Sequence, residues 1–518
     1  MKRKKKGKKA NPKVANKRAE LIRNNSELVL DTYGGKVTVC WDPKPSVTGQ
    51  GQLAFFAEFL KTTGIFDALV DDCPVSYRSN NASTNQEVIG TLLLSVLSGH
   101  YRYSHVTSIR QDHVSADLLG IERMVSEDTV RRWLLELKEE EGINWLSCHL
   151  RKCVDVLLDK DWVLDIDSTV KCIYGKQEGA VKGYNPTKPG RPSLVHHTYF
   201  ASSLRLVLDV DVQPGNQCSS AHAQPKLWAY IDDLPKEKRP TFIRGDNAFG
   251  NEHMMLEAEN RAVDYLFKLK QTSNVKRLIN RVNSRNYWYE TEKGWECTES
   301  SLCLTGWTKE RRVIVLRRRI REQIVLANEA VPGQAKQLAF IEVDSSVGQY
   351  EYVVLVTSLS LPIESFGQLY RDRADAENIF DELKNQWGWG GFVTQDLTRC
   401  KISAKFIALI YNWWSLYAGL IFPDKHREAI TSRPLLLNSF GRKTTTGGKT
   451  ILTLSSSHAR AKPVQLMLEK TAAFLSRLNG LAEQLTKEQV WRIVLSRSLY
   501  RFLHGEFLGP PKMLPVFG

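Results

Sequence analysis

The most constraining stretch of the sequence is a charged segment, residues 370–384, which reads YRDRADAENIFDELK. As an α-helix, at about 100° per residue, it would place Tyr370, Arg373, Glu377 and Lys384 within an arc of about 60°. The apolar side chains would lie on the other side, where they can pack on a core: Ala376, Ile379, Phe380 and Leu383. We therefore predict one well-anchored helix that holds a carboxylate between two cations.

A solvated charged face would give the same pattern, and it is the ordinary alternative. Two observations speak against it. A tyrosine and an arginine gain little from a purely solvated face, and the next residues, 385–392 (NQWGWGGF), are too aromatic for an ordinary surface turn.

The composition points to a polyanionic partner. The 518 residues carry a formal net charge of +15, and such a basic excess favours nucleic acid or an anionic membrane. The most apolar stretches are too short or too interrupted to span a bilayer, and no apolar segment follows the N-terminal lysines as in a signal peptide. The nine cysteines include no Cys-x-x-Cys pair, so we expect a reducing, cytoplasmic and nucleoid-associated setting.

The N-terminal part is predicted to contact DNA. Residues 1–25 form a lysine-rich arm that cannot bury apolar surface; it could neutralise phosphates, although a solubilising tail or a nuclear localisation signal would look the same. Residues 26–160 are mostly helical by pattern. Within them Ser126 caps a helix that presents Arg131 and Arg132 near its start, as a recognition helix does, although short capped helices with arginines are common.

The middle of the chain, residues 161–270, has the pattern of three strands, helix, strand, helix, strand, which predicts an α/β layer with a mixed sheet. Asp165 and Asp167 end the first strand and point to the same face, because side chains alternate along a strand. Asp246 ends the fourth strand, in the segment PTFIRGDNAF.

The remaining chain is expected to fall into three parts. Residues 271–361 form a β-rich insertion, 362–420 complete the α/β core with the charged helix, and 421–518 form a helical C-terminal region. The glycine-rich segment 441–449 is predicted to be a mobile loop. The strands expected in the insertion lie at 287–289, around 295, and at 302–307, 312–319, 339–343 and 352–359.

Three carboxylates could meet at one edge of this sheet. If the strands that end in Asp167 and Asp246 are parallel neighbours, both side chains leave the sheet at the edge where α/β proteins place their sites. A helix across that edge could add Glu377. Three oxygen ligands with open positions suit one or two Mg²⁺ or Mn²⁺ ions, and two such ions can catalyse phosphodiester chemistry.

These residues resemble the DDE transposases of the insertion-sequence-4-like superfamily. The helix has the family's Tyr-x2-Arg-x3-Glu-x6-Lys spacing, and the segments LDIDST and IRGDNAFG match its two aspartate boxes. The segment KGYNP at 182–186 and the helical N-terminal region make the chain most similar to the insertion-sequence-1380 type, over roughly residues 50–500.

The resemblance implies an RNase H-like core that is interrupted by a β-rich insertion and flanked by helical N- and C-terminal regions. It implies a transposase that binds terminal inverted repeats as a dimer, cuts them with Mg²⁺, often through a hairpin intermediate, and joins them to target DNA. The expected catalytic and metal-binding residues are Asp167, Asp246 and Glu377. The expected phosphate contacts come from Tyr370, Arg373 and Lys384.

Several alternatives stay open. Asp165 could take the place of Asp167 as the ligand. Trp288, Trp295 and Trp307 are candidates to stack on a flipped base, although each is more often a core residue. The function could also be that of an RNase H-like nuclease without strand transfer, or of a catalytically inactive DNA-binding regulator.

Overall fold

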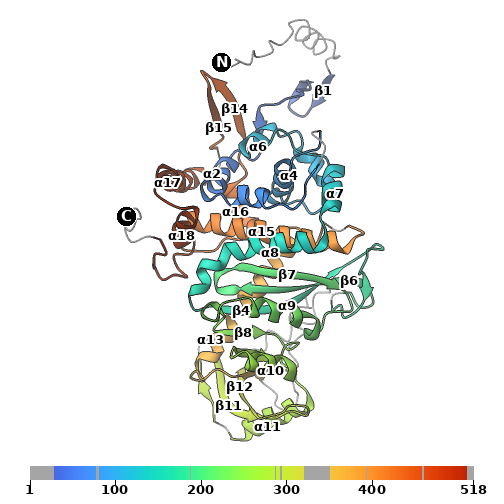
Figure 1. Cartoon of the computed structure of the whole chain (residues 1–518), viewed down its shortest axis with the longest axis vertical. Helices are drawn as coiled ribbons and strands as arrows, with labels where there is room; N and C mark the ends of the chain where they lie inside the picture. The colour runs from blue at the N-terminus through green and yellow to red at the C-terminus, as the bar shows by residue number, and fades with distance from the viewer. Residues whose placement is uncertain are drawn as a thin grey trace, which may run out of the picture.

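The structure is a computed structural model, and it describes residues 28–77, 81–186, 188–285, 287–291, 294–319, 350–392, 394–457 and 460–509. The predicted basic arm at 1–25 and the predicted strand at 339–343 lie outside these residues. Figure 1 shows an elongated molecule, with a helical body at one end and a long sheet that reaches the other end.

One sheet of ten strands forms the centre of the fold. Its order is β10-β11-β12-β13-β9-β8-β4-β6-β5, and β7 pairs with β6. The sheet is mixed, as predicted, because β8 runs parallel to both β4 and β9 while the other pairs are antiparallel. The strands are β4 Val163–Cys172, β5 Val181–Lys182, β6 Pro192–Ala201, β7 Leu206–Pro214, β8 Phe242–Gly245, β9 Asp264–Lys268, β10 Tyr289–Glu290, β11 Trp295–Leu302, β12 Arg311–Arg319 and β13 Tyr350–Thr357.

The β-rich stretch continues this sheet instead of building a sheet of its own. Strand β13 pairs with β9 through contacts such as Leu355 opposite Lys268, and β11 and β12 follow outward. The strand expected around residue 295 is β11, whereas the separate strand expected at 302–307 is wrong, because residues 303–307 form the turn after β11. A second apolar cluster fills this end of the molecule, with Trp295 and Phe366 among its buried members.

The helices fall into an N-terminal and a C-terminal group that pack together. Helices α2 and α17 contact each other, and α15 contacts α4, α8 and α18. Figure 1 shows α8 and α15 side by side between this helical body and strand β7. The helices are α2 Leu53–Thr63, α3 Ile65–Asp71, α4 Asn85–Leu97, α5 Val106–Ile109, α6 His113–Leu118, α7 Glu127–Glu136, α8 Glu139–Val154, α9 Ser220–Asp232, α10 Glu252–Asn260, α11 Ser273–Arg285, α13 Ser365–Arg371, α14 Ala374–Asn385, α15 Leu397–Ile421, α16 Ala429–Leu436, α17 Ala461–Gly480 and α18 Lys487–Ser498.

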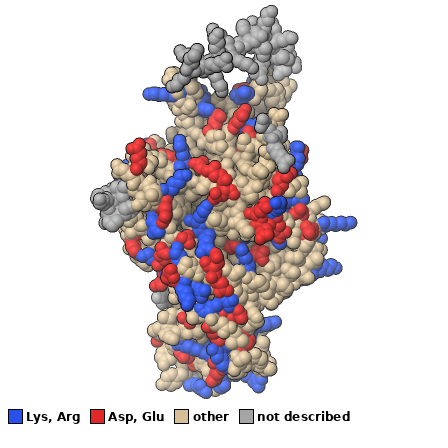
Figure 2. Space-filling view, in the orientation of Figure 1, with Lys and Arg blue, Asp and Glu red and all other residues tan. Residues whose placement is uncertain are grey.

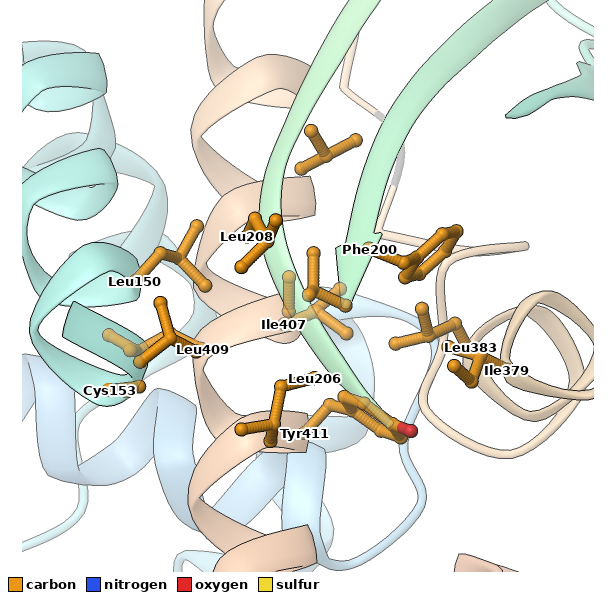
Figure 3. Close-up of a cluster of buried hydrophobic side chains, with 14 of the residues drawn as sticks. Leu150, Cys153, Phe200, Leu206, Leu208, Ile379, Leu383, Ile407, Leu409 and Tyr411 are labelled. Atoms are coloured by element: carbon orange, nitrogen blue, oxygen red, sulfur yellow. The ribbon is translucent and has the colours of Figure 1, made fainter. Parts of the chain in front are cut away.

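Helix α15 is buried on almost every side, which explains its apolar sequence. Figure 3 shows Ile407, Leu409 and Tyr411 of α15 among side chains from α8 and β7, while α14 approaches Phe200 from the other side. Of its 25 residues, 19 are buried within the protein. No helix in the described part of the chain is both long and apolar enough to cross a membrane.

The predicted mobile loop at 441–449 is instead a β-hairpin. Strands β14 Gly441–Thr446 and β15 Lys449–Leu454 pair in register around a two-residue turn, and β3 Val47–Thr48 adds to β14. The turn residues Gly447 and Gly448 both have positive φ, 58° and 78°. A Gly-Gly pair between two strand-like runs is a hairpin signal, so the loop prediction misread its glycines. A further hairpin, β1 Leu28–Thr32 and β2 Gly35–Val39, stands before α2.

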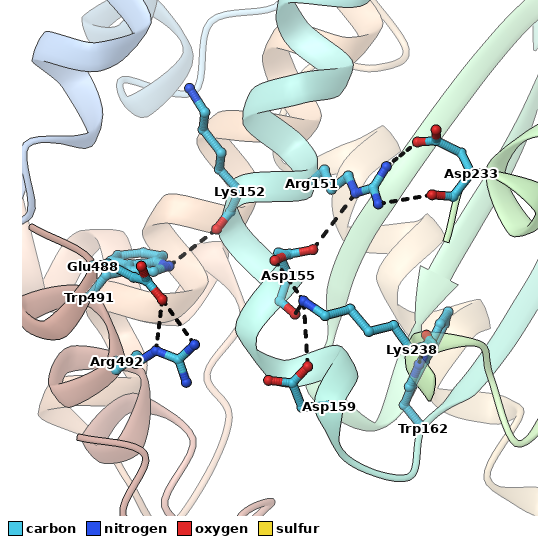
Figure 4. Close-up of polar contacts among 10 residues, drawn as sticks. All are labelled: Arg151, Lys152, Asp155, Asp159, Trp162, Asp233, Lys238, Glu488, Trp491 and Arg492. Atoms are coloured by element: carbon cyan, nitrogen blue, oxygen red, sulfur yellow. Dashed lines mark hydrogen bonds and ion pairs between the residues drawn. The ribbon is translucent and has the colours of Figure 1, made fainter. Parts of the chain in front are cut away.

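A polar seam joins the helical body to the sheet (Figure 4). At the end of α8, Arg151 reaches the backbone and side chain of Asp233, and Lys238 bonds Asp155 at 2.9 Å. Trp491 of α18 donates to the Lys152 carbonyl at 3.2 Å. The visible face of the molecule accordingly mixes charges of both signs in one band (Figure 2), so it carries no broad single-sign surface.

Asn412 should be a strong stability determinant, because it closes the open edge of β7. Its buried amide accepts from the Val207 N–H (2.9 Å) and donates to the Val207 carbonyl (2.7 Å). Asn412→Ala should lower the free energy of unfolding by about 2–5 kcal/mol, since two buried backbone groups lose their partner. Urea denaturation measures this. Asn479→Ala replaces an exposed residue of α17, and its free energy of unfolding should stay within about 0.5 kcal/mol of that of the wild type. Equal losses in the two variants would contradict the role assigned to Asn412.

Candidate active site

Two parallel strands bring the predicted aspartates to one sheet edge. Strands β4 and β8 pair from Val163 opposite Phe242 to Ile166 opposite Gly245. Asp167 and Asp246 are the next residues on the two strands, so they lie side by side where β8 ends. The prediction that these strands are parallel neighbours is confirmed.

Asp165 and Asp167 meet different arginines. Asp165 is 1% exposed and forms a two-pronged ion pair with Arg244 of β8, at 2.8 Å for Nη2 to Oδ2. The same guanidinium donates to the Leu369 carbonyl of α13. Asp165 is therefore engaged in holding α13 on the sheet. Asp167 accepts instead from Arg373, at 2.7 Å.

The predicted single helix at 370–384 is wrong, because the chain breaks into α13 and α14 around Asp372 and Arg373. The Arg373 N–H donates to the Tyr370 carbonyl (3.2 Å) in a short turn. The two halves are anchored in different cores. Phe366 of α13 packs in the second apolar cluster, whereas Ile379 and Leu383 of α14 are buried in the main one.

Arg373 bridges two of the three predicted acids. One nitrogen, Nη2, bonds Asp167, and the other, Nη1, bonds Glu377 at 2.9 Å. The arginine side chain is 11% exposed and Glu377 is 64% exposed, so the bridge runs from the protein interior to the surface. Burial acts to lower the pKa of Arg373, but the charges of Asp167, Asp246 and Glu377 outweigh it and raise this pKa above its ordinary value.

The acids influence one another electrostatically. Burial raises the pKa of Asp167 to about 7; the charges of Asp246 and Glu377 add to the rise, and Arg373 and the Ser168 N–H oppose it. Asp246 itself accepts from the Ala248 N–H at 2.9 Å. Within the described residues, no three His, Cys, Asp or Glu side chains are placed to hold a metal ion together. The guanidinium stands between Asp167 and Glu377 instead.

The other predicted phosphate contacts flank this bridge. Tyr370 is partly buried against the second apolar cluster. Burial lowers the pKa of Lys384, while the negative charge of Asp167 acts to raise it, which puts this cation within electrostatic reach of the site. Behind it, His196 is buried and stacks on Trp389 with ring centroids 5.3 Å apart.

The arginines predicted to bind DNA from the N-terminal region lie on α7. Arg131 pairs with Glu127 at 2.7 Å and covers the Tyr103 ring at 4.9 Å. Arg132 is exposed and its Nε donates to the Asp128 carbonyl. Their DNA contact stays a prediction.

The three candidate tryptophans are each covered by an arginine of β12. The guanidinium carbons lie 3.8 Å from the Trp288 ring, 4.9 Å from Trp295 and 5.4 Å from Trp307, contributed by Arg317, Arg318 and Arg311. Each contact covers one face of its ring, so that face is not open to a base in this arrangement. A stacking role for any of the three stays a prediction.

Sequence reasoning missed the role of Arg244. A signal was present, because an arginine inside an apolar strand, as in Phe-Ile-Arg-Gly, must find a carboxylate partner if it is buried. Two of the expected strands carry acids, one with Asp165 and Asp167 and one with Asp209 and Asp211. The rule therefore predicts a structural ion pair for Arg244 but does not choose between the two strands.

Comparison with known families identifies the class of protein. The model of the family described as Transposase DDE domain group 1 matches residues 36–479. The chain therefore belongs to this family of DDE transposases. It is a metal-dependent polynucleotidyl transferase or nuclease of DNA transposition and recombination, and it binds DNA. DDE transposase domains generally use divalent metal ions.

Other comparisons add little. Among solved structures, a piggyBac transposase synaptic complex with hairpin DNA matches with a TM-score of 0.34 and 13% identity, covering 87% of this chain and 86% of that one. A likeness of this size supports no inference about fold or function. No curated protein gave a significant match.

Stability should depend on pH through Asp167. Its folded pKa of about 7 lies above the ordinary value of 3.8, so folding favours the protonated form. This contribution is complete below about pH 4 and is lost as the pH rises through 7. Asp167→Asn cannot titrate, so between those limits it should gain about 2–4 kcal/mol relative to wild type.

Urea denaturation across this pH range, with a chelator present, measures the difference. Asn378→Ala replaces an exposed residue of α14 and introduces no titrating group. Its free energy of unfolding should therefore differ from that of the wild type by the same amount at every pH. A constant difference for Asp167→Asn as well would contradict the burial of a titrating carboxyl at this position.

Proposed function

We infer that this protein is a cut-and-paste DDE transposase that binds the terminal inverted repeats of an insertion sequence and catalyses DNA strand cleavage and transfer. The observation that carries the proposal is the grouping of Asp167, Asp246 and Glu377 around one buried arginine. Membership of the DDE family supports it. We assign these three residues as the catalytic acids, and Asp167 rather than Asp165 because Asp165 is committed to Arg244.

The acids suit a divalent metal by their chemistry. All three offer hard carboxylate oxygens, which Mg²⁺ and Mn²⁺ prefer, and Asp167 lacks enough positive charge around it to ionise at its ordinary pKa. We propose that Asp167, Asp246 and Glu377 would hold two Mg²⁺ or Mn²⁺ ions. When bound, such ions help to activate an attacking hydroxyl and to stabilise the leaving oxygen of a phosphodiester.

The cations around the acids suit a DNA phosphate. The planar guanidinium of Arg373 matches a phosphate in a two-pronged geometry, and it already bridges two carboxylates here. Lys384 of α14 adds a positive point charge, and Tyr370 of α13 can donate a hydrogen bond from its hydroxyl. We propose that these three side chains position the reacting phosphate against the acids.

Finer features belong to the same proposal. We propose an RNase H-like core, membership of the insertion-sequence-1380 type, action as a dimer that pairs two DNA ends, and a hairpin intermediate. Arg131 and Arg132 of α7 are proposed to contact the inverted repeat. The exposure of Arg132 on α7 supports a contact from this helix.

The decisive test uses a labelled duplex that carries the element's own terminus, incubated with Mg²⁺. Glu377→Gln should lower the cleavage rate at least about 1000-fold, since it removes a carboxylate ligand, and leave binding of the duplex within about twofold. Asp381→Asn makes the same chemical change on the same helix at an exposed position and should keep cleavage. Denaturing gels separate nicked, hairpin and transferred products.

Each outcome is informative. Loss of binding in Glu377→Gln would make α14 a docking surface instead of a catalytic one. Cleavage without joining to a target duplex would reduce the activity to that of a nuclease. Wild-type protein that binds its termini yet never cuts them would point to an inactive regulator.

A further inference from the structure

The connection between β4 and β6, residues 173–191, forms an exposed basic loop that the site does not use. It includes the KGYNP segment, and Thr187 within it lies outside the described residues. By sequence the loop has four cations and one acid. The cations, all exposed, are Lys176, Lys182, Lys188 and Arg191. The acid, Glu178, is also exposed, and it accepts from the Leu397 N–H at 3.0 Å.

Two of these cations are gathered on one tyrosine. Tyr174 is 66% exposed, and the charged groups of Lys188 and Arg191 lie 5.0 and 4.8 Å from its ring centre. Lys188 also donates to the tyrosine hydroxyl. Within the described residues neither cation pairs with a carboxylate. The aromatic ring thus holds two unneutralised charges close together at the surface, which favours an anion that can engage both.

The loop is held in one shape from beneath. Asn185 is 5% exposed; its carbonyl accepts from the Lys188 N–H (2.9 Å) and its amide donates to the Arg191 carbonyl (3.5 Å). Gly183 packs so closely that an added Cβ would lie 1.9 Å from the Gly215 carbonyl oxygen. A loop fixed in this way loses little conformational entropy when it binds a ligand.

The loop is also tied to the site. It continues directly from β4, and five residues of extended strand from Asp167 to Cys172 span about 17 Å. The Glu178 N–H donates to the Gln395 carbonyl at 2.9 Å, which joins the loop to the segment that follows α14. This length, from Asp167 to the end of β4, corresponds to about five nucleotide steps of a duplex at about 3.4 Å each, and the loop follows it in the chain.

We propose that the basic loop binds the phosphate backbone of duplex DNA several base pairs from the reacting phosphate, with Lys188 and Arg191 as the contacting cations, Tyr174 as their support and Asn185 as a positioning residue. The distance to the reacting phosphate rests on the proposed function, whereas the DNA contact itself does not. In Figure 2, lysine and arginine side chains project from the right-hand edge of the molecule, at the level of β6 in Figure 1.

The test is the salt dependence of DNA binding. The full-length protein is titrated, without divalent metal, against a labelled duplex carrying the element's terminus at about 50–200 mM salt. Each phosphate contact contributes about 0.9 to the slope of log affinity against log salt. Lys188→Ala with Arg191→Ala should therefore make this slope about 1.8 shallower, and the loss should be the same on a duplex of unrelated sequence because phosphates carry no sequence information.

The matched control removes the same two residue types elsewhere. Lys470→Ala with Arg477→Ala lies on α17, exposed and on the opposite side of the molecule in Figure 1, and should leave the slope within about 0.3 of wild type. Asn185→Ala changes no charge but frees the loop, so it should weaken binding severalfold while keeping the wild-type thermal midpoint within a few degrees. Thermal unfolding of every variant checks that it is folded.

The outcomes separate this inference from the proposed function. An unchanged slope in the folded Lys188→Ala, Arg191→Ala variant, or an equal loss in the α17 control, would overturn it. A shallower slope in the loop variant alone supports it even if the wild-type protein never cleaves DNA. Conversely, cleavage that depends on Glu377 with no effect of the loop variant would leave the catalytic proposal standing and end this one.

Discussion

The arrangement of the site depends on two arginines that reach one strand. Asp165 and Asp167 share a face of β4, and with no cation near them both would be too costly to bury in ionised form. Arg244 takes the first and Arg373 the second. The Asp165–Arg244 pair is buried between β4 and β8, and Arg244 also holds α13 by donating to the Leu369 carbonyl. The second pair extends to Glu377, so it links the sheet edge to the start of α14.

This division accounts for the interruption between α13 and α14 at Asp372 and Arg373. Its first half is fixed to the second apolar cluster by Phe366 and to the sheet by Arg244, whereas its second half is fixed to β6 by Ile379, Phe380 and Leu383. Each half buries its apolar side chains in a different apolar cluster. Arg373 lies between the two halves and bonds Asp167, so the packing of the halves also fixes the position of this guanidinium.

Local pattern predicts much of the fold and part of the candidate site. Period-two alternation predicts the strand that carries Asp165 and Asp167, and its parallel pairing with the strand before Asp246 is the condition on which the grouping of the acids depends. The helix break was not readable, because it arises from packing partners far away in sequence. The hairpin at 441–454 was readable from its Gly-Gly turn but was missed. The pairing of β13 with β9 depends on residues about ninety positions apart, and strand alternation says nothing about which neighbour a strand chooses.

The covering of β7 has a consequence for how copies of this chain can associate. On the described chain, one end of the long sheet is shielded by α8 and α15, with Asn412 occupying the hydrogen-bonding groups of Val207, and the other end is β10, only two residues long. Along β7, the backbone groups of Val207 are therefore closed to a neighbouring polypeptide that would extend the sheet. In concentrated solution we expect strand addition to be disfavoured at this edge.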